Sequence, residues 1–257
     1  MRTNFIINPR YKEIKSFLKN IPEIFDNRGE IIHQNRRNTI KVIEYNGLKF
    51  NVKKFGKPLF ANRLSYTYVR DSKAKRAYEY SFRFNSSGIP TPEGVAYIEQ
   101  FDGGLITYSY FISLQSELKH VMSELYAKPL NGNEKLFKQF AIFTAKMHDS
   151  GINHLDYSLG NILFDLDDNG DFKFEVVDIN RVDFENVSQE SGCKSFVKLW
   201  LEDDIFEYMS GFYAQQREMN FERTKKMVLF FRHKFVIETN LHKALKNNIK
   251  RFKRAKL

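Results

Sequence analysis

Residues 154–161 have the sequence His154-Leu-Asp156-Tyr-Ser-Leu-Gly-Asn161, and an apolar run, Ile-Leu-Phe, follows directly at 162–164. One short loop therefore carries a carboxylate, Asp156, and an amide, Asn161, at a separation that does not depend on long-range packing. Phosphoryl transfer requires such a pair, because a carboxylate faces the acceptor hydroxyl while an amide oxygen holds a metal ion. By chance, the pattern arises in roughly one sequence of this composition in forty, so the surrounding residues must support the interpretation.

A second carboxylate, Asp178, follows at the end of the apolar strand predicted for Phe174–Val177. Because Mg²⁺ prefers hard oxygen ligands and takes few of them from the protein, Asn161 and Asp178 are a plausible pair of metal ligands. A helix with one apolar face is predicted just before the loop, from the spacing of Leu136, Phe140, Phe143 and Met147. These flanking elements favour a phosphoryl-transfer loop over an ordinary surface loop.

The first half of the chain contains a lysine and a glutamate that would complete such a site. Lys53 lies near the end of a strand predicted at Leu48–Phe55, where the kinase pattern expects Val-Ala-Ile-Lys, and can hold the α- and β-phosphates of ATP. Glu79, on the next helix, is the expected carboxylate partner of its ammonium group. Lys54 is the alternative lysine, but strand alternation directs only one of the two to the site, and Lys53 aligns with the motif.

The order of the predicted elements indicates an α+β fold with two lobes. Strand-like runs are expected at Ile40–Tyr45, Leu48–Phe55, Gly94–Phe101 and Leu105–Leu114, the first two joined by the hairpin signal Asn46-Gly47. A helix that Asp71 or Ser72 can cap lies between the two pairs and ends before Gly88. We therefore predict a β-rich N-lobe with one helix at residues 1–113 and a mainly helical C-lobe at residues 114–257.

Taken together, these motifs resemble the lipopolysaccharide kinase family of the protein-kinase-like superfamily, from about Gly47 to Asp183. The similar stretches are Val52-Lys53-Lys-Phe55, Ser72-Lys-Ala-Lys-Arg-Ala-Tyr-Glu79-Tyr, Gly88-Ile-Pro-Thr-Pro92, His154–Asn161 and Val177-Asp178-Ile-Asn-Arg181. The resemblance implies a two-lobed protein-kinase-like fold, ATP and Mg²⁺ as cofactors, and 3-deoxy-octulosonic acid (Kdo) or heptose of the lipopolysaccharide inner core as acceptor. It also implies that Asp156 is the catalytic carboxylate, Asn161 and Asp178 the metal ligands, and Lys53 with Glu79 the phosphate-positioning pair.

Departures from protein kinases bear on the acceptor. No Gly-x-Gly-x-x-Gly motif precedes the strand of Lys53, and the corresponding stretch, Ile31–Asn38, contains Arg36 and Arg37, which either cover the phosphates or are simply solvated. The Asp-Phe-Gly triplet is replaced by Asp178-Ile-Asn, and no Ala-Pro-Glu motif follows. These departures argue against a platform for a protein substrate, whereas a sugar or glycolipid acceptor requires none.

The composition is that of a folded, water-soluble chain. Its 257 residues, 42% of them hydrophobic, suit one large domain or two lobes. Cys193 is the single cysteine, which excludes an internal disulfide and a multi-thiolate metal site within one chain. The first twenty residues carry charges throughout, and no apolar run approaches the roughly 20 residues that span a bilayer. We therefore expect a cytoplasmic protein.

Positive charge is concentrated in the C-terminal tail, Leu241–Leu257, which contains basic residues and no acidic one, within a chain of formal charge +10. Such a tail is either a solvated basic helix end or a surface for a polyanion. Because the implied acceptor is an anionic glycolipid, we expect the tail to contact it or the anionic inner-membrane surface. No nucleic-acid partner is expected, since basic residues are not interleaved with aromatic ones through the fold.

Two other functions stay open. The motifs indicate the phosphate donor well and the acceptor hardly at all, so a soluble sugar, another small molecule or a protein could be the acceptor. The chain could also be a non-catalytic basic binding module, although all five expected catalytic side chains are present.

Overall fold

The computed structural model describes the backbone of residues 2–254 and the side chains of residues 2–246. The chain divides into two compact units, one formed by Met1–Lys119 with Glu175–Arg181 and the other by His120–Phe174 with Val182–Leu257. The first unit is built on a sheet and the second is mainly helical, as predicted for an α+β fold. The lobe boundary between residues 113 and 114 stays a prediction.

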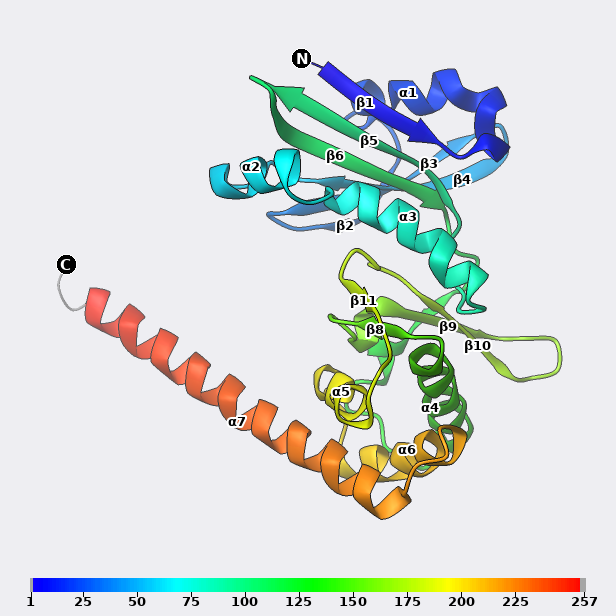
Figure 1. Ribbon diagram of the computed structural model, residues 1–257, viewed down its shortest axis with the longest axis vertical. Helices are drawn as coiled ribbons and strands as arrows, with labels where there is room; N and C mark the ends of the chain where they lie inside the picture. The colour runs from blue at the N-terminus through cyan, green and yellow to red at the C-terminus, as the bar shows by residue number, and fades with distance from the viewer. Residues whose placement is uncertain (1, 255–257) are drawn as a thin grey trace. The chain divides into compact units, whose positions relative to one another are not determined.

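A six-stranded antiparallel sheet forms the first unit, with the strand order β1-β5-β6-β4-β3-β2 (Figure 1). Its strands are β1 (Arg2–Ile7), β2 (Glu30–Gln34), β3 (Asn38–Tyr45), β4 (Leu48–Phe55), β5 (Gly94–Asp102) and β6 (Leu105–Leu114). The four predicted strands are all present, and Asn46 and Gly47 turn between β3 and β4 with φ of 50° and 76°, as a type I′ hairpin requires. The sequence pattern did not indicate β1 and β2, which form the two edges.

Helices pack on both faces of this sheet, because successive residues of a strand point to opposite sides. On one face, α1 (Lys15–Ile24) buries Phe17, Leu18 and Ile21 in a core that contains Phe50 and Val52 of β4. On the other face, α3 (Lys73–Ser86) buries Ala74 and Tyr78 together with Phe55 of β4 and Tyr97 of β5. The side chain of Ser72 caps α3 by accepting a hydrogen bond from the backbone N–H of Lys75, as the sequence predicted.

Two helices of the first unit were not predicted. They are α1, which a 3₁₀ turn at Pro9–Ile14 precedes, and α2 (Phe60–Tyr68), which lies between β4 and α3. Proline at position 22 and the short apolar pattern obscure α1 in the sequence, although its buried residues recur at helical spacing. The sheet is therefore covered by more helical structure than the single predicted helix.

The segment Glu175–Arg181 belongs to the first unit although residues 120–174, which precede it in sequence, belong to the second. The backbone N–H of Val176 donates to the carbonyl of Pro90, and the Thr91 hydroxyl donates to the carbonyl of Val176 at 2.6 Å. Further along, Arg76 Nε donates to the carbonyl of Asn180 at 3.1 Å. These bonds attach the residues around Asp178 to α3 and to the segment between α3 and β5.

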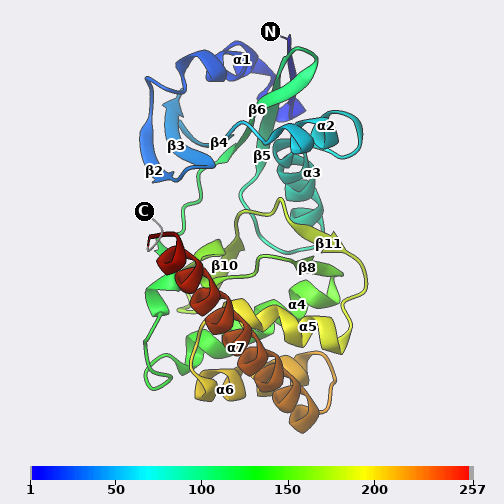
Figure 2. The same ribbon diagram turned by 90° about the vertical axis from the view of Figure 1, so that its left-hand side faces the viewer.

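The second unit is helical around short strands (Figure 2). Its helices are α4 (Glu134–Asp149), α5 (Gln189–Ser195), α6 (Asp203–Gln216) and α7 (Phe221–Arg254). Three strands form one small sheet in the order β10 (Phe172–Val176), β9 (Ile162–Leu166) and β7 (His120–Val121). A second sheet consists of β11 (Val182–Phe184) and β8 (Ile152–His154). α4 packs against α6, and α6 packs against the first part of α7. Within the described residues, no helix combines the length and apolarity needed to cross a membrane.

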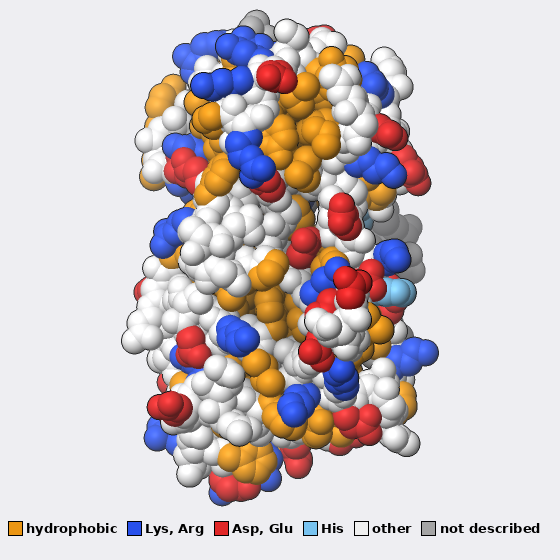
Figure 3. Space-filling model, turned by 90° about the vertical axis from the view of Figure 1, so that its right-hand side faces the viewer, with side chains coloured by type: hydrophobic (Ala, Val, Ile, Leu, Met, Phe, Trp, Pro, Cys, Tyr) orange, Lys and Arg blue, Asp and Glu red, His pale blue; other side chains and the backbone are white. Residues whose placement is uncertain are grey.

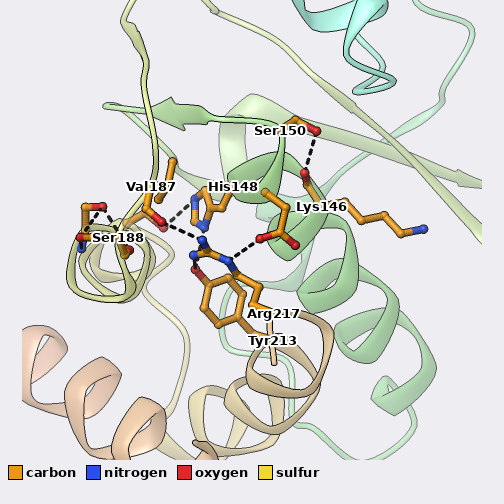
Figure 4. A network of polar contacts seen from close by, with 10 residues as sticks. Lys146, His148, Ser150, Val187, Ser188, Tyr213 and Arg217 are labelled. Carbon is orange, nitrogen blue, oxygen red and sulfur yellow. Dashed lines mark hydrogen bonds and ion pairs between the residues drawn. The ribbon is translucent and has the colours of Figure 1, made fainter. Parts of the chain in front are cut away.

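A polar network that includes the buried His148 and Tyr213 joins α4 to α6 (Figure 4). Arg217 donates to the Asp149 carboxylate, the Tyr213 hydroxyl and the carbonyl of Val187, at 2.6–2.7 Å. The Tyr213 hydroxyl lies 2.8 Å from His148 Nδ1. Because the hydroxyl already accepts from Arg217, its own proton can go to Nδ1, which requires a neutral imidazole. Burial and, to a smaller extent, the positive charge of Arg217 together lower the pKa of His148 to about 3.

The neutral His148 predicts a stability that falls in acid. In the unfolded chain this histidine binds a proton below about pH 6.5, whereas in the folded chain it stays neutral down to about pH 3, so acid favours unfolding across that window. Between pH 7 and pH 5 the group alone lowers the free energy of unfolding by about 2 kcal/mol. In urea unfolding, His148→Asn should lose correspondingly less stability over this interval than the wild type. Equal losses would assign the acid sensitivity to other groups.

Candidate active site

Lys53 is held on the α3 face of the sheet at the end of β4. Its side chain is nearly buried, and its Nζ lies 2.6 Å from Asp178 Oδ1. Lys54, the neighbouring residue, points to the opposite face, where its Nζ lies 3.0 Å from Asp26 Oδ1. Strand alternation thus separates the two lysines as expected, and Lys53 is the one that meets a predicted metal ligand.

Asp178 has a left-handed backbone, with φ of 58°. Such a conformation costs a non-glycine residue on the order of 1–3 kcal/mol and tends to occur at functional sites, although aspartate tolerates it better than most. Oδ1 of Asp178 accepts hydrogen bonds from Lys53 Nζ and from the side-chain amide of Asn180. The carboxylate is therefore fixed in direction by two donors of the same unit.

Glu79 lies one helical turn after Lys75 on α3, and its carboxylate is 3.8 Å from Lys75 Nζ. Lys75 in turn makes its shorter contact, 2.7 Å, with Asp71. The structure thus brings Lys53 to Asp178 and places Glu79 beside Lys75. The Lys53–Glu79 pair stays a prediction.

Cations gather around Asp178. One of them is Lys73, which the sequence analysis did not predict as a site residue. Burial lowers the pKa of Lys73, and the nearby positive charges of Arg181, Lys53 and Arg37 lower it further, while Asp178 opposes the shift. The ammonium groups of Lys73 and Lys53 both lie over the Phe55 ring, 5.7 Å and 5.4 Å from its centroid. In the sequence, only its position could have indicated Lys73, because it is the first residue of α3, directly after the cap residue Ser72. Several cations around one carboxylate suit a multiply charged anion such as a nucleotide's phosphates.

The turn between β2 and β3 occupies the place in sequence where a glycine-rich loop was sought. Asn35 Oδ1 accepts hydrogen bonds from the backbone N–H groups of Arg37 and Asn38, which sets the turn. The carbonyl of Arg37 accepts from the N–H of Gly56 at 2.7 Å. A Cβ on Gly56 would lie only 2.8 Å from that carbonyl oxygen, so this close approach requires glycine. The turn is thus held to the end of β4 by Arg37, whose charge also acts on Lys73.

Asp156 and Asn161 lie together in the second unit. Asn161 Nδ2 donates to the backbone carbonyl of Asp156 at 2.9 Å, so the amide oxygen of Asn161 is the atom that the predicted metal site would use. The N–H of Asp156 donates to Nδ1 of His154 at 3.1 Å, and His154 is itself buried in the β8–β11 pair. Tyr157, fully buried, bonds Thr144 of α4 at 2.8 Å. The loop is therefore anchored on both sides of Asp156.

Lys198 is a second residue that the sequence did not single out. Its Nζ donates to Asp156 Oδ1 at 2.9 Å and to the carbonyl of Leu155 at 2.8 Å. It comes from the short 3₁₀ helix Phe196–Lys198, far along the chain from the loop. No local motif marks it, because the contact is created by folding of the second unit.

The candidate site offers few side chains that could bind a metal ion. Among the residues that the structure describes, no three or more His, Cys, Asp or Glu side chains gather where they could hold one. Mg²⁺ is compatible with fewer protein ligands, because it keeps several waters and binds substrate phosphates as well. The carboxylate of Asp178 and the amide oxygen of Asn161 are of the hard type that it prefers, so the residues fit the ion.

A family model, the lipopolysaccharide kinase (Kdo/WaaP) family, matches residues 26–191, which is more than half of the chain. The chain belongs to the Kdo/WaaP lipopolysaccharide kinase family. The match includes all five residues predicted for the site, Lys53, Glu79, Asp156, Asn161 and Asp178. Lys198 lies outside the matched segment. Membership in this kinase family implies ATP as the phosphate donor.

One solved structure shares the fold of this chain. WaaP in complex with acyl carrier protein aligns with a TM-score of 0.62 and 16% identity, over 91% of this chain and 98% of that one. This likeness confirms the predicted two-lobed kinase-like fold. WbdD bound to a kinase inhibitor aligns with a TM-score of 0.44 and 14% identity, over 80% of this chain and 45% of that one. The comparison with curated proteins found no match.

Proposed function

We propose that this Kdo/WaaP family kinase transfers the γ-phosphate of ATP to a sugar hydroxyl, of Kdo or heptose, in the lipopolysaccharide inner core. The observation that carries the proposal is Asp178, in a chain that matches the family model. Its backbone is left-handed, and its carboxylate is held by Lys53 within a group of cations. The donor site of a kinase requires cations for the phosphates and a carboxylate for the metal ion, and the family match supports this use of Lys53 and Asp178.

The side chains have separate tasks in this reaction. Lys53, with Lys73 and Arg37 near it, binds the phosphates and neutralises their charge. Bound Mg²⁺, held by Asn161 and Asp178, would withdraw charge from the phosphates. Asp156 orients the sugar hydroxyl and accepts its proton as the phosphoryl group leaves, and Lys198 keeps the Asp156 carboxylate in place. Glu79 is proposed to support the phosphate-binding lysine.

An acceptor assay tests the proposal. Wild type and Asp178→Ala are incubated with γ-labelled ATP, Mg²⁺ and either purified lipopolysaccharide inner core, free Kdo, an unrelated sugar or a protein mixture. We expect label on the core with the wild type and background with the variant. Label on another acceptor only would keep the kinase and remove the substrate, whereas wild-type label at the level of Asp178→Ala on every acceptor would contradict the mechanism.

Lys198 should act as a positioning residue for Asp156. In Lys198→Met the carboxylate loses its cationic partner, and we expect kcat to fall about tenfold to a hundredfold while KM for ATP changes little, because misplacing a catalytic group mainly lowers kcat. Lys198→Arg should recover part of the activity. Lys194→Met, an exposed lysine on the preceding helix, is the matched control. Steady-state kinetics that show equal effects at both lysines would rule out this role.

The basic tail is proposed to contact the acceptor glycolipid or the anionic inner-membrane surface. Lys243 and Lys246 lie on the exposed part of α7, while the side chains of Lys250, Arg251, Lys253, Arg254 and Lys256 lie outside the described residues. Ending the chain after Asn240 should raise KM for membrane-embedded acceptor severalfold and leave KM for ATP unchanged. Unchanged turnover of the lipid-embedded acceptor by the folded, shortened chain would refute a tethering role.

A further inference from the structure

Helix α2 exposes its apolar side to solvent, the reverse of an ordinary surface helix. Phe60, Leu64 and Tyr68 recur at i, i+4 and i+8, which places them along one stripe, and Leu59 and Val69 flank them. The exposed fractions of Phe60, Tyr68 and Val69 are 66%, 72% and 83%. None of the nine residues of α2 is buried. We call Leu59, Phe60, Leu64, Tyr68 and Val69 the α2 patch.

Polar residues next to this stripe fasten α2 to the sheet. Arg63 Nε donates to the carbonyl of Ile106 at 2.8 Å, and its Nη2 donates to the carbonyl of Asp102 at 3.2 Å. Thr67 Oγ1 accepts from the N–H of Ile106 at 3.1 Å. The helix therefore lies against β6 through specific hydrogen bonds (Figure 1). Because polar contacts fix this orientation, the outward apolar stripe is part of the fold.

The charge around the patch indicates its partner. Two exposed cations, Lys57 and Arg70, flank α2 in sequence, whereas Arg63 bonds to the sheet, and residues 56–70 contain no acidic residue. On the face drawn in Figure 3, in contrast, acidic and basic side chains are interspersed. An apolar stripe with aromatic rings and an exposed cation near each end matches the interface of an anionic lipid bilayer, where rings sit among headgroups and cations meet phosphates. A two-fold dimer through the same surface would bring two sets of these cations together.

We propose that the α2 patch inserts shallowly into the surface of a membrane that contains anionic lipid. The proposal rests on α2 and the residues directly next to it. It requires neither ATP nor an acceptor, so it can be tested independently of the kinase reaction. A few partly inserted side chains with about two cations give weak, reversible, salt-sensitive binding, because each basic residue near such a surface contributes only about 1 kcal/mol.

Vesicle sedimentation of the full chain tests the proposal. Vesicles of phosphatidylcholine alone and with phosphatidylglycerol are compared at low and high salt. We expect binding to the anionic vesicles, weakened by salt, and a loss of about fivefold or more in Phe60→Ser/Tyr68→Ser. A double variant of equally exposed apolar residues on α7, Phe230→Ser/Ile237→Ser, is the matched control and should lose less. Unchanged binding of the α2 variant, or equal binding to neutral vesicles, would overturn the proposal.

A fluorescence experiment locates the contact without relying on a loss of binding. The only tryptophan, Trp200, is replaced in Trp200→Phe, and a reporter is then placed by Tyr68→Trp on α2 or by Ile31→Trp on β2. On addition of anionic vesicles, the emission of the α2 reporter should shift to shorter wavelength and that of the β2 reporter should not. Sedimentation equilibrium of the same proteins reports self-association. A patch-dependent dimer without a vesicle-induced shift would contradict the lipid assignment.

Discussion

Asp156→Asn is expected to lower kcat for phosphate transfer about a hundredfold to ten-thousandfold, with KM for ATP nearly unchanged. The amide keeps the size of the side chain but cannot accept the sugar's proton, and a positioned base contributes an effect of this order. The loop should remain folded, because its anchors are His154 and Tyr157 rather than the carboxylate. Steady-state kinetics give kcat and KM, with the acceptor that the labelling assay identifies.

The control for this prediction is Asp168→Asn, an exposed carboxylate in the turn between β9 and β10. It removes the same charge from the same unit and should change kcat less than about twofold, since isolated surface charges act weakly. Thermal melting of both variants reports folding. If Asp156→Asn retained most of the wild-type kcat, Asp156 would not be the carboxylate that accepts the proton.

Lys53→Met is expected to lower kcat/KM for ATP about a hundredfold or more, in contrast to Lys54→Met. The two lysines are neighbours on β4, but Lys53 Nζ contacts Asp178 on the α3 face and Lys54 Nζ contacts Asp26 on the other. Removing the cation from the Asp178 side takes away charge that the phosphates would meet, and preorganised charge of this kind is a large part of phosphoryl-transfer catalysis. Lys54→Met should change kcat/KM less than about threefold.

The pair of variants also controls for stability, because each loses one ammonium group and one ion pair. Nucleotide binding by calorimetry, measured beside melting temperature, separates lost binding from lost folding. Equal losses of kcat/KM in the two variants would mean that strand position does not distinguish the lysines, and the assignment of Lys53 would be wrong.

Much of the fold could be predicted because it depends on short-range patterns. The Asn46-Gly47 turn, the Ser72 cap and the apolar face of α4 are each specified within a few residues, and each is present. Strand β1 and helix α1 were missed for the opposite reason. β1 pairs with β5 about ninety residues away, so its stability comes from a partner that its own sequence does not indicate.

The residues of the candidate site divide in the same way. Asp156 and Asn161 share a loop, and the alternation of β4 separates Lys53 from Lys54 whatever the rest of the chain does. The contacts of these residues were not predictable. Lys53 meets Asp178 across 125 positions of sequence, and Lys198 meets Asp156 across 42. Lys73, at the start of α3, likewise carries no motif.

The sequence by itself determined the residues of the phosphoryl-transfer pattern and their order, because loop spacing and strand parity are local geometry. Only the tertiary structure decided which charges meet: Asp178 with Lys53, Asp156 with Lys198, and Glu79 with Lys75. It also decided that the apolar stripe of α2 stays exposed, since the orientation of the helix depends on hydrogen bonds between Ile106 and the side chains of Arg63 and Thr67. The physical reason is the same in each case: electrostatic and hydrogen-bond partners are chosen by distance in space, which only the packed chain defines.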